Sequence, residues 1–307
     1  MMKKHFKKLV NLTLTAIIVM GMSTTTFAAV NKLTTMSIQV SNEYDYISML
    51  KQSTTEELDE IGITREEADN IISEFNAALS KRATLSDTQL ITYGYTTEEI
   101  DILRAYAKGT RVSDNSIRAI TGTCTGNIKL TNCGTKYATF AYTWSWDHCP
   151  IMTLSDSAAM RWLAYDKKGY NFSVIRTNLT TTIDYYNGST KQFTRSGKEE
   201  AGLELNTVNL QFDVTKSYQS STTLTEEAYA KYGTVKVSVQ VDNSVNNNIN
   251  YIMVAGLYGH TTIGGAFPSV SLSPTGSVSI SFSGNLSIDK IGAKKAKIGT
   301  GSTITYL

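Results

Sequence analysis

The chain has 307 residues, 41% of them hydrophobic, and a net charge of +2. Residues 1–28 hold four lysines and no acidic residue, so the rest carries 25 basic and 27 acidic side chains, a net charge of −2. This balance argues against a nucleic-acid partner. No later stretch approaches the roughly 18 consecutive apolar residues of a membrane span, so no transmembrane segment is expected after residue 28.

The N-terminus has the three parts of a secretory signal peptide. A basic start is followed by the apolar stretch Leu9–Met22, and small residues, Thr26 and Ala28, stand at the −3 and −1 positions of a cleavage site. We therefore expect residues 1–28 to be removed after Ala28 and the protein to be secreted. The alternative is an uncleaved membrane anchor.

After a connector at 29–50, residues 51–110 contain an acidic helical repeat with an offset of 32 residues. Each copy has a Gly, Gly62 or Gly94, that suits the end of a short helix. Each also has two Ser/Thr-x-x-Glu/Gln capping boxes, which mark helix starts. The capping pairs are Thr54 with Glu57, Thr64 with Glu67, Ser86 with Gln89 and Thr96 with Glu99. The pattern predicts helices near 54–61, 64–80, 86–93 and 96–108.

This order of short helix, glycine and Thr-capped helix resembles the helix-hairpin-helix of DNA-binding proteins and the ubiquitin-associated helical module. The turns, Ile61-Gly-Ile-Thr and Tyr93-Gly-Tyr-Thr, lack the Gly-x-Gly hairpin of the first. Residues 31–112 carry 8 basic and 14 acidic side chains, which would repel phosphate. A packed unit of two αα-hairpins is the prediction.

Glycine and polar residues are frequent at 111–127 and predict a linker there. A β-rich region is expected to follow at 128–307. Aromatic residues alternate with small ones from Phe140 to Trp146, which is typical of a strand. Asn187-Gly188 predicts a hairpin turn, whereas Thr225–Lys231 suggests a helix. The fold class expected is α+β: a small all-α unit followed by an antiparallel β-sandwich.

Export permits disulfides, and the chain has three cysteines, Cys124, Cys133 and Cys149. Cys124 and Cys133 flank eight residues that can turn back on themselves, so these two are the favoured pair. Pairing of Cys149 with either of the others remains the alternative. A Cys149 left free would be a buried thiol, a dimer link or a nucleophile.

Candidate catalytic residues are few, and no metal site or cofactor motif is present. Cys149, His148 and His260 are the weak candidates, since a Cys nucleophile needs a base nearby. His148 is poorly placed for this, because adjacent residues of an extended chain point to opposite faces. The spacing of His and Cys fits no metal site. The interpretation therefore leans away from an enzyme.

Binding residues are predicted from exposed aromatic and basic groups. The candidates are Trp144, Trp146, Lys294, Lys295 and Lys297, with a cell-wall polymer, a glycan or a protein as ligand. Residues 268–289 form a Ser-rich amphipathic hairpin like the membrane-inserting hairpins of pore-forming toxins. Its first arm is short for a spanning strand, and a strand pair in a soluble sandwich is favoured.

The Lys-rich signal, the helical repeat and the motifs Trp144-Ser-Trp146 and Tyr258-Gly-His260 together resemble exported proteins of Gram-positive bacteria that have no assigned activity. The expected function is a non-catalytic, secreted binding or cell-surface interaction protein. The alternative is a secreted hydrolase or membrane-active toxin in which residues 29–111 are removed as a pro-region.

Overall fold

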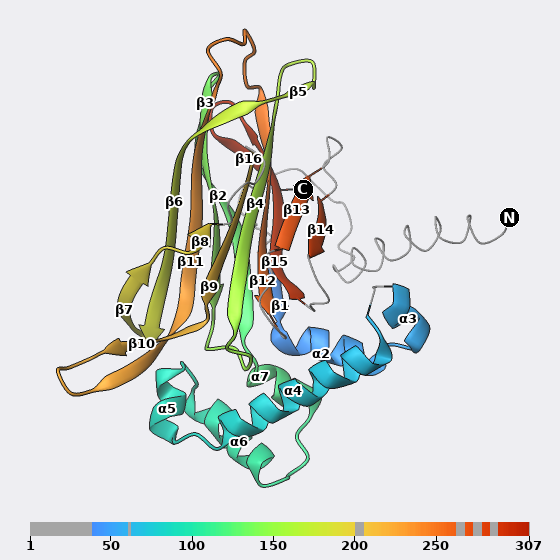
Figure 1. Cartoon of the computed structure of the whole chain (residues 1–307), viewed down its shortest axis with the longest axis vertical. Helices are drawn as coiled ribbons and strands as arrows, with labels where there is room; N and C mark the ends of the chain where they lie inside the picture. The colour runs from blue at the N-terminus through green and yellow to red at the C-terminus, as the bar shows by residue number, and fades with distance from the viewer. Residues whose placement is uncertain are drawn as a thin grey trace, which may run out of the picture. The chain divides into compact units, whose positions relative to one another are not determined.

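Two antiparallel β-sheets lie face to face, with helices at one end of them, in a computed structural model of the chain (Figure 1). The structure describes residues 39–60, 63–199, 206–261, 268–272, 278–282 and 288–306. The predicted signal peptide, residues 1–28, and Gly62 lie outside the described residues. Among the described helices, none has the length and apolar character needed to cross a membrane.

The first sheet runs in the order β1-β2-β3-β11-β6-β7, with β10 also paired to β11. All of its described pairings are antiparallel. Its strands are β1 (Gln39–Asn42), β2 (Thr123–Cys133), β3 (Tyr137–Trp146), β6 (Val174–Asn187), β7 (Thr190–Arg195), β10 (Thr215–Gln219) and β11 (Thr225–Val241).

The second sheet runs in the order β16-β15-β12-β4-β9-β8, with β5 also paired to β4. Its strands are β4 (Ser155–Tyr165), β5 (Asn171–Phe172), β8 (Lys198–Glu199), β9 (Thr207–Asp213), β12 (Tyr251–Thr261), β15 (Ile288–Gly299) and β16 (Thr303–Tyr306). A separate two-stranded sheet pairs β13 (Pro268–Leu272) with β14 (Val278–Phe282), so the hairpin expected within 268–289 forms.

Aromatic side chains fill the space between the sheets. The alternating residues of β3 predicted from the sequence all point inward and are buried. The ring centroids of Phe140 and Trp162 are 5.7 Å apart, and those of Trp144 and Tyr258 are 5.5 Å apart, which joins the two sheets. Such pairs add to the hydrophobic burial of large side chains, which dominates core stability.

Six helices lie at one end of the sheets. Their bounds are α2 (Glu43–Gln52), α3 (Thr55–Glu60), α4 (Arg65–Ala83), α5 (Asp87–Thr92), α6 (Thr97–Ala107) and α7 (Asp114–Ala119). The helices expected near 54–61, 64–80, 86–93 and 96–108 match α3 to α6, and all four capping boxes form. Each box satisfies backbone N–H groups that have no partner inside the helix.

The helices are not a free-standing pair of αα-hairpins. α2 and α7, which the sequence analysis did not predict, supply Ile47, Leu50 and Ile117 to the same buried cluster. The predicted connector, 29–50, thus contains β1 and most of α2, and the predicted linker, 111–127, contains α7 and the start of β2. The described residues form one compact unit.

Two local predictions for the β-rich region have opposite outcomes. β6 and β7 form the expected hairpin, but its two-residue loop is Gly188-Ser189, because Asn187 still pairs with Thr190, and Gly188 has φ +59°. Thr225–Lys231, predicted as a helix, is instead the first part of β11. The prediction is wrong because the segment pairs with β10 along its length and with β6 at its end, so tertiary pairing overrides its local helix preference.

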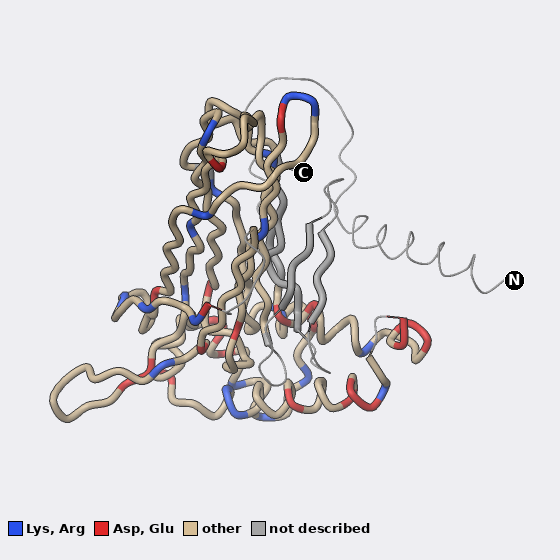
Figure 2. Tube along the Cα trace, turned by 45° about the horizontal axis from the view of Figure 1, so that its top comes forward, with Lys and Arg blue, Asp and Glu red and all other residues tan. Residues whose placement is uncertain are grey.

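Charge is distributed unevenly over the described residues. Asp and Glu gather over α3 and the first turn of α4 (Figure 2). Acidic groups at these positions interact favourably with the partial positive charge of a helix N-terminus. The acidity predicted from the composition therefore has a local structural role.

Gly94 ends α5 in the left-handed conformation, φ +88°, and a Cβ there would lie 2.8 Å from Tyr229 Oη. Gly109 is a matched control, because it has φ +72° and nothing within 4 Å of its Cβ position. We expect Gly109→Ala to lower the free energy of unfolding by about 1 kcal/mol through backbone strain alone. Gly94→Ala should lose about 1–3 kcal/mol more through overpacking. Urea unfolding of both variants measures this, and equal losses would contradict it.

Candidate functional site

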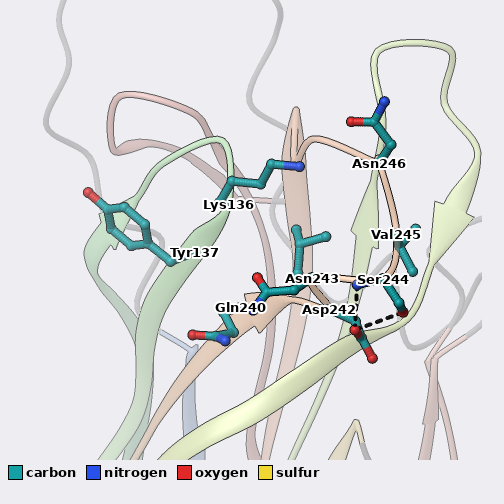
Figure 3. Close-up of a pocket in the computed structure, with 9 residues that line it drawn as sticks. Lys136, Tyr137, Gln240, Asp242, Asn243, Ser244, Val245 and Asn246 are labelled. Atoms are coloured by element: carbon teal, nitrogen blue, oxygen red, sulfur yellow. Dashed lines mark hydrogen bonds between the residues drawn. The ribbon is translucent and has the colours of Figure 1, made fainter.

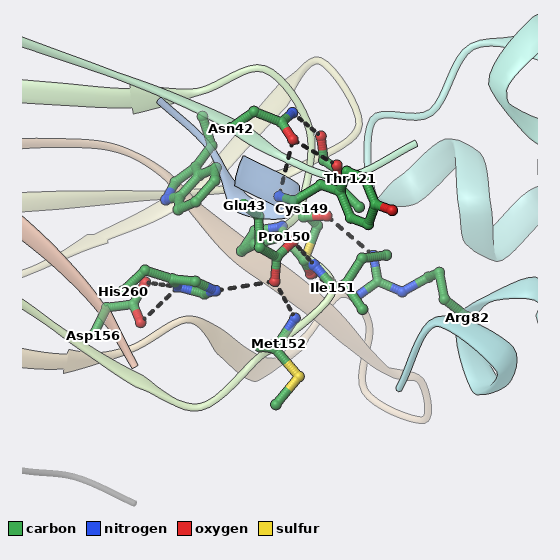
Figure 4. Close-up of polar contacts among 12 residues, drawn as sticks. Asn42, Glu43, Arg82, Thr121, Cys149, Pro150, Ile151, Met152, Asp156 and His260 are labelled. Carbon is green, nitrogen blue, oxygen red and sulfur yellow. Dashed lines mark hydrogen bonds and ion pairs between the residues drawn. The ribbon is translucent and has the colours of Figure 1, made fainter. Parts of the chain in front are cut away.

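His260 lies in the centre of a buried ionic network where the helices meet the sheets (Figure 4). Its Nδ1 is 3.0 Å from both carboxylate oxygens of Asp156, and its Nε2 is 3.1 Å from Oε1 of Glu43. Tyr258 donates its hydroxyl to Asp156 and accepts a hydrogen bond from Trp146 Nε1 at 2.9 Å. The side chains of His260, Asp156 and Glu43 are at most 1% exposed.

Glu43 is the first residue of α2, yet its carboxylate points into the core. It accepts hydrogen bonds from the backbone N–H groups of Ile151 and Met152, both at 2.8 Å. Its own N–H donates to the carbonyl of Gly122 at 2.9 Å. A buried carboxylate is stable only when paired and hydrogen-bonded. Glu43 meets this condition with partners from three distant parts of the chain.

The charges of the network determine its protonation. Burial alone would lower the pKa of His260, but the carboxylates of Asp156 and Glu43 outweigh it and raise that pKa from 6.5 to about 10. Burial alone would raise the pKa of Glu43, but His260 and the two backbone N–H groups hold it below 4.5. At neutral pH, His260 is therefore an imidazolium that donates from both nitrogens.

A second buried cluster surrounds Cys149. The guanidinium of Arg82 donates to the carbonyls of Cys149 at 3.1 Å and Pro150 at 2.8 Å and to Tyr95 Oη at 3.0 Å. The backbone N–H of Cys149 donates to the carbonyl of Tyr93 at 2.8 Å. Burial raises the pKa of the Cys149 thiol to about 12, even though Arg82 acts in the opposite direction.

The three catalytic candidates from the sequence do not form a reactive arrangement. His148 stacks on Tyr95, its Nδ1 lies 3.2 Å from Asp147, and its Nε2 has no hydrogen-bond partner among the described residues. His260 is fully engaged by two carboxylates, and Cys149 is a protonated thiol with no exposed surface. A nucleophilic cysteine needs thiolate and access, and Cys149 has neither.

The predicted disulfide between Cys124 and Cys133 is wrong, because both cysteines belong to the same extended strand, β2. At a rise of ~3.3 Å per residue they are about 30 Å apart, whereas a disulfide joins Cα atoms within about 7 Å. All three cysteines are buried, and none of them forms a disulfide. The segment that seemed able to turn back on itself instead pairs with β3 along its length.

Two of the five predicted binding residues are buried and not available to a ligand. Trp144 and Trp146 are 2% and 1% exposed and belong to the core, so their prediction as surface residues is wrong. The alternation of aromatic and small residues identifies one face of β3. A single sequence does not show whether that face points into the core or towards solvent. Lys297 is exposed, with its Nζ 3.9 Å from the ring centroid of Tyr251. The side chains of Lys294 and Lys295 lie outside the described part of the structure.

The end of the sheets opposite the helices, here called the loop end, is built from four connections, residues 134–136, 166–170, 242–250 and 300–302 (Figure 1). Backbone hydrogen bonds tie them together. Ile249 N donates to Thr135 O at 2.8 Å, Asn250 N to Tyr165 O at 2.7 Å, and Gly301 N to Cys133 O at 2.9 Å. Loops held on a rigid scaffold commonly carry binding residues.

A hollow of about 520 Å³ opens between the loop at 242–246 and the start of β3 (Figure 3). Its volume falls in the range of small-molecule sites, ~300–1,000 Å³. Tyr137, Gln240, Asn243, Ser244 and Asn246 line it with aromatic, amide and hydroxyl groups. The loop is ordered by Asp242, whose Oδ1 accepts hydrogen bonds from the N–H and the hydroxyl of Ser244, both at 2.8 Å.

Three side chains extend from this hollow across the outer face of the first sheet. Ile175 pairs with Gln240, and Gln240 pairs with Tyr137, on the adjacent strands β6, β11 and β3. Directly paired residues point to the same face, and the neighbours of Gln240, Val239 and Val241, are buried. The row is therefore outward-facing, with Tyr137 50% and Ile175 42% exposed.

Sequence reasoning missed most of this site. The only signal was the polar run Asn246–Asn250, interpreted as a turn before a strand. The row itself depends on strand register, which the sequence does not specify for strands far apart in the chain. The hairpin at 268–289, weighed as membrane-inserting, has described arms of five residues each, short of the about 9–11 residues of a spanning strand.

Comparisons with known proteins add no functional information. No protein-family model matches the sequence, and no curated protein matches it. Among solved structures, the collagen-binding subdomain of the Enterococcus faecalis surface protein ACE is similar at 10% identity and a TM-score of 0.26, over 55% of this chain and 92% of that one. AvmM, which catalyses macrocyclization in alchivemycin A biosynthesis, is similar at 9% identity and a TM-score of 0.23, over 55% and 88%. Neither similarity carries an argument about function.

The ionic network makes stability depend on pH. Because the folded pKa of His260 is raised above 6.5, its contribution is fully present below pH 6.5 and is lost as pH rises towards 10. Glu43, whose pKa is lowered, contributes above pH 4.5 and loses its contribution as pH falls. We expect the difference in unfolding free energy between the wild type and His260→Gln to narrow from pH 6.5 to 10. Urea unfolding across this range measures it, and a constant difference would refute the ionic assignment.

The buried thiols should be unreactive in the folded protein. Burial raises the pKa of Cys133 to about 11 and, despite Arg82, that of Cys149 to about 12. We expect a maleimide to label none of the three cysteines in the native protein within minutes and all three in urea. Mass spectrometry counts the adducts. Rapid labelling of Cys149 in the native state would show an accessible thiol and revive its role as a nucleophile.

Proposed function

We propose that this chain is an exported, non-catalytic protein that binds an extracellular ligand through the loop end. The single observation that supports this most is the contrast between the two ends of the sheets. Helices cover one end, where the network of His260 and Glu43 is sealed. The opposite end presents a hollow, with Tyr137 50% and Tyr170 69% exposed. Exposed aromatic side chains beside polar groups are typical of binding surfaces.

The helices are a permanent part of this protein in our proposal. Removal of residues 29–111 as a pro-region would take away β1, Asn42 and Glu43. Asn42 Nδ2 donates to the carbonyls of Thr121 and Arg118 at 2.9 and 3.0 Å. Loss of Glu43 would also leave the N–H groups of Ile151 and Met152 without their acceptor and His260 Nε2 without its carboxylate partner, with Asp156 as the remaining counter-charge. Buried polar groups left unpaired are strongly destabilising, which argues against the hydrolase and toxin alternatives that need this removal.

A binding assay tests the proposal. Residues 29–307 are produced and sedimented with insoluble bacterial cell walls and with immobilised extracellular glycans and proteins. We expect saturable binding to at least one of them, and a loss of at least about tenfold in affinity for the double variant Tyr137→Ala, Tyr170→Ala, since aromatic anchors dominate binding energy.

The matched control is Ile91→Ala, Met49→Ala, which removes two exposed apolar side chains from the helices. This variant should bind like the wild type. Equal affinity of the loop-end variant and the wild type would overturn the proposal. The proposal would also be overturned if the intact mass of the protein recovered from culture medium corresponds to a chain that begins near residue 112, because that product lacks α2 to α6.

A further inference from the structure

We infer that the row formed by Tyr137, Gln240 and Ile175, with the adjoining hollow, binds a polysaccharide without net charge. This inference rests on the proposed function and specifies its ligand. The row crosses three neighbouring strands, so its outer backbones are about 10 Å apart at the usual strand spacing. That span is long enough for more than one sugar ring of a polymer lying across the strands.

Tyr137 provides a fixed platform on which a sugar ring can stack. Its ring lies against the backbone of Gly134, where an added Cβ would be 2.8 Å from Tyr137 Cε1. The N–H of Gly134 also donates to the carbonyl of Tyr137 at 2.8 Å. The ring is therefore held from one side while half of the side chain remains open. A rigid aromatic side chain loses little conformational entropy on binding.

The groups beside Tyr137 match the hydroxyl groups of a sugar. Gln240, Asn243 and Asn246 each offer a donor and an acceptor, and Ser244 offers a hydroxyl. This mixture of one aromatic platform and several neutral hydrogen-bonding groups is what a neutral, polar and partly apolar ligand requires. It differs from an anion site, where cations converge.

The charges at the hollow are balanced and already engaged. Its lining contains one cation, Lys136, and one anion, Asp242. Lys136 Nζ donates to the carbonyl of Asn247 at 2.7 Å, and Asp242 accepts from Ser244. Because the two charges are of opposite sign, the lining has no net charge to attract an ionic polymer, so an uncharged ligand is favoured over an anionic one.

The pairing of the strands disfavours an extended peptide as ligand. β3 is hydrogen-bonded to β2 and β11, and β11 to β3 and β6. The backbone groups around Tyr137 and Gln240 thus have strand partners on both sides, whereas strand addition needs a free edge. Recognition here takes place through side chains on the sheet face.

Affinity electrophoresis of residues 29–307 through gels that contain an uncharged polymer tests the inference. The four polymers are hydroxyethyl cellulose, a mixed-linkage β-glucan, dextran and mannan. We expect at least one to retard the protein, with the apparent Kd unchanged when salt is raised tenfold, because no ion pair is formed. Tyr137→Ala should weaken binding at least tenfold, Gln240→Ala severalfold, and Tyr137→Phe little.

Tyr232→Ala is the matched control. Tyr232 lies on the same strand as Gln240, near the helices, and is 42% exposed, so its loss should leave retardation unchanged. Circular dichroism confirms that each variant is folded. Cell-wall or protein binding that still depends on Tyr137, without retardation by any neutral polymer, would overturn this inference and leave the proposed function standing. Salt-sensitive binding to an anionic polymer alone would also overturn it. If Tyr137 and Tyr170 affect no ligand, both proposals fail.

Discussion

The contact between Glu43 and His260 is the interaction on which the rest of the structure depends. Two carboxylates and one imidazolium share a space from which water is excluded, and each is stable only while the others are present. This requirement fixes α2 against β12 and holds the segment around Ile151 and Met152 in place. Replacing His260 would leave two carboxylates in the core without their shared counter-charge, and replacing Glu43 would leave His260 Nε2 and the N–H groups of Ile151 and Met152 without their acceptor.

That constraint divides the chain into two ends with different roles. At the helical end, the polar groups that could perform chemistry hold the structure together. The guanidinium of Arg82, for example, donates hydrogen bonds to two carbonyl oxygens and a tyrosine hydroxyl. At the loop end, by contrast, polar side chains face outward around a hollow. Because the helices close one end, the loop end is where we propose that a ligand binds.

Local signals in the sequence predicted local structure well. The capping residues Thr64, Ser86 and Thr96 specify helix starts through short-range hydrogen bonds, and Gly188 permits the left-handed backbone conformation of the turn between β6 and β7. Which face of a strand is buried was not predictable in this way. The alternation of aromatic and small residues around Trp144 fits a face that points into the core as well as one that points outward. The pairing of Glu43 with His260 and the row from Ile175 to Tyr137 depend on long-range register, which a single sequence does not show.

The separation of Glu43 from His260 along the chain has a consequence for the order of folding. The two residues are 217 positions apart, and the ribosome delivers the first long before the second. The caps of the early helices form from neighbours, but the carboxylate of Glu43 has no counter-charge until nearly the whole chain has emerged. Contacts of such long range close late. A chain without His260 cannot complete this contact, so the junction of helices and sheets requires nearly the whole chain to be available for folding.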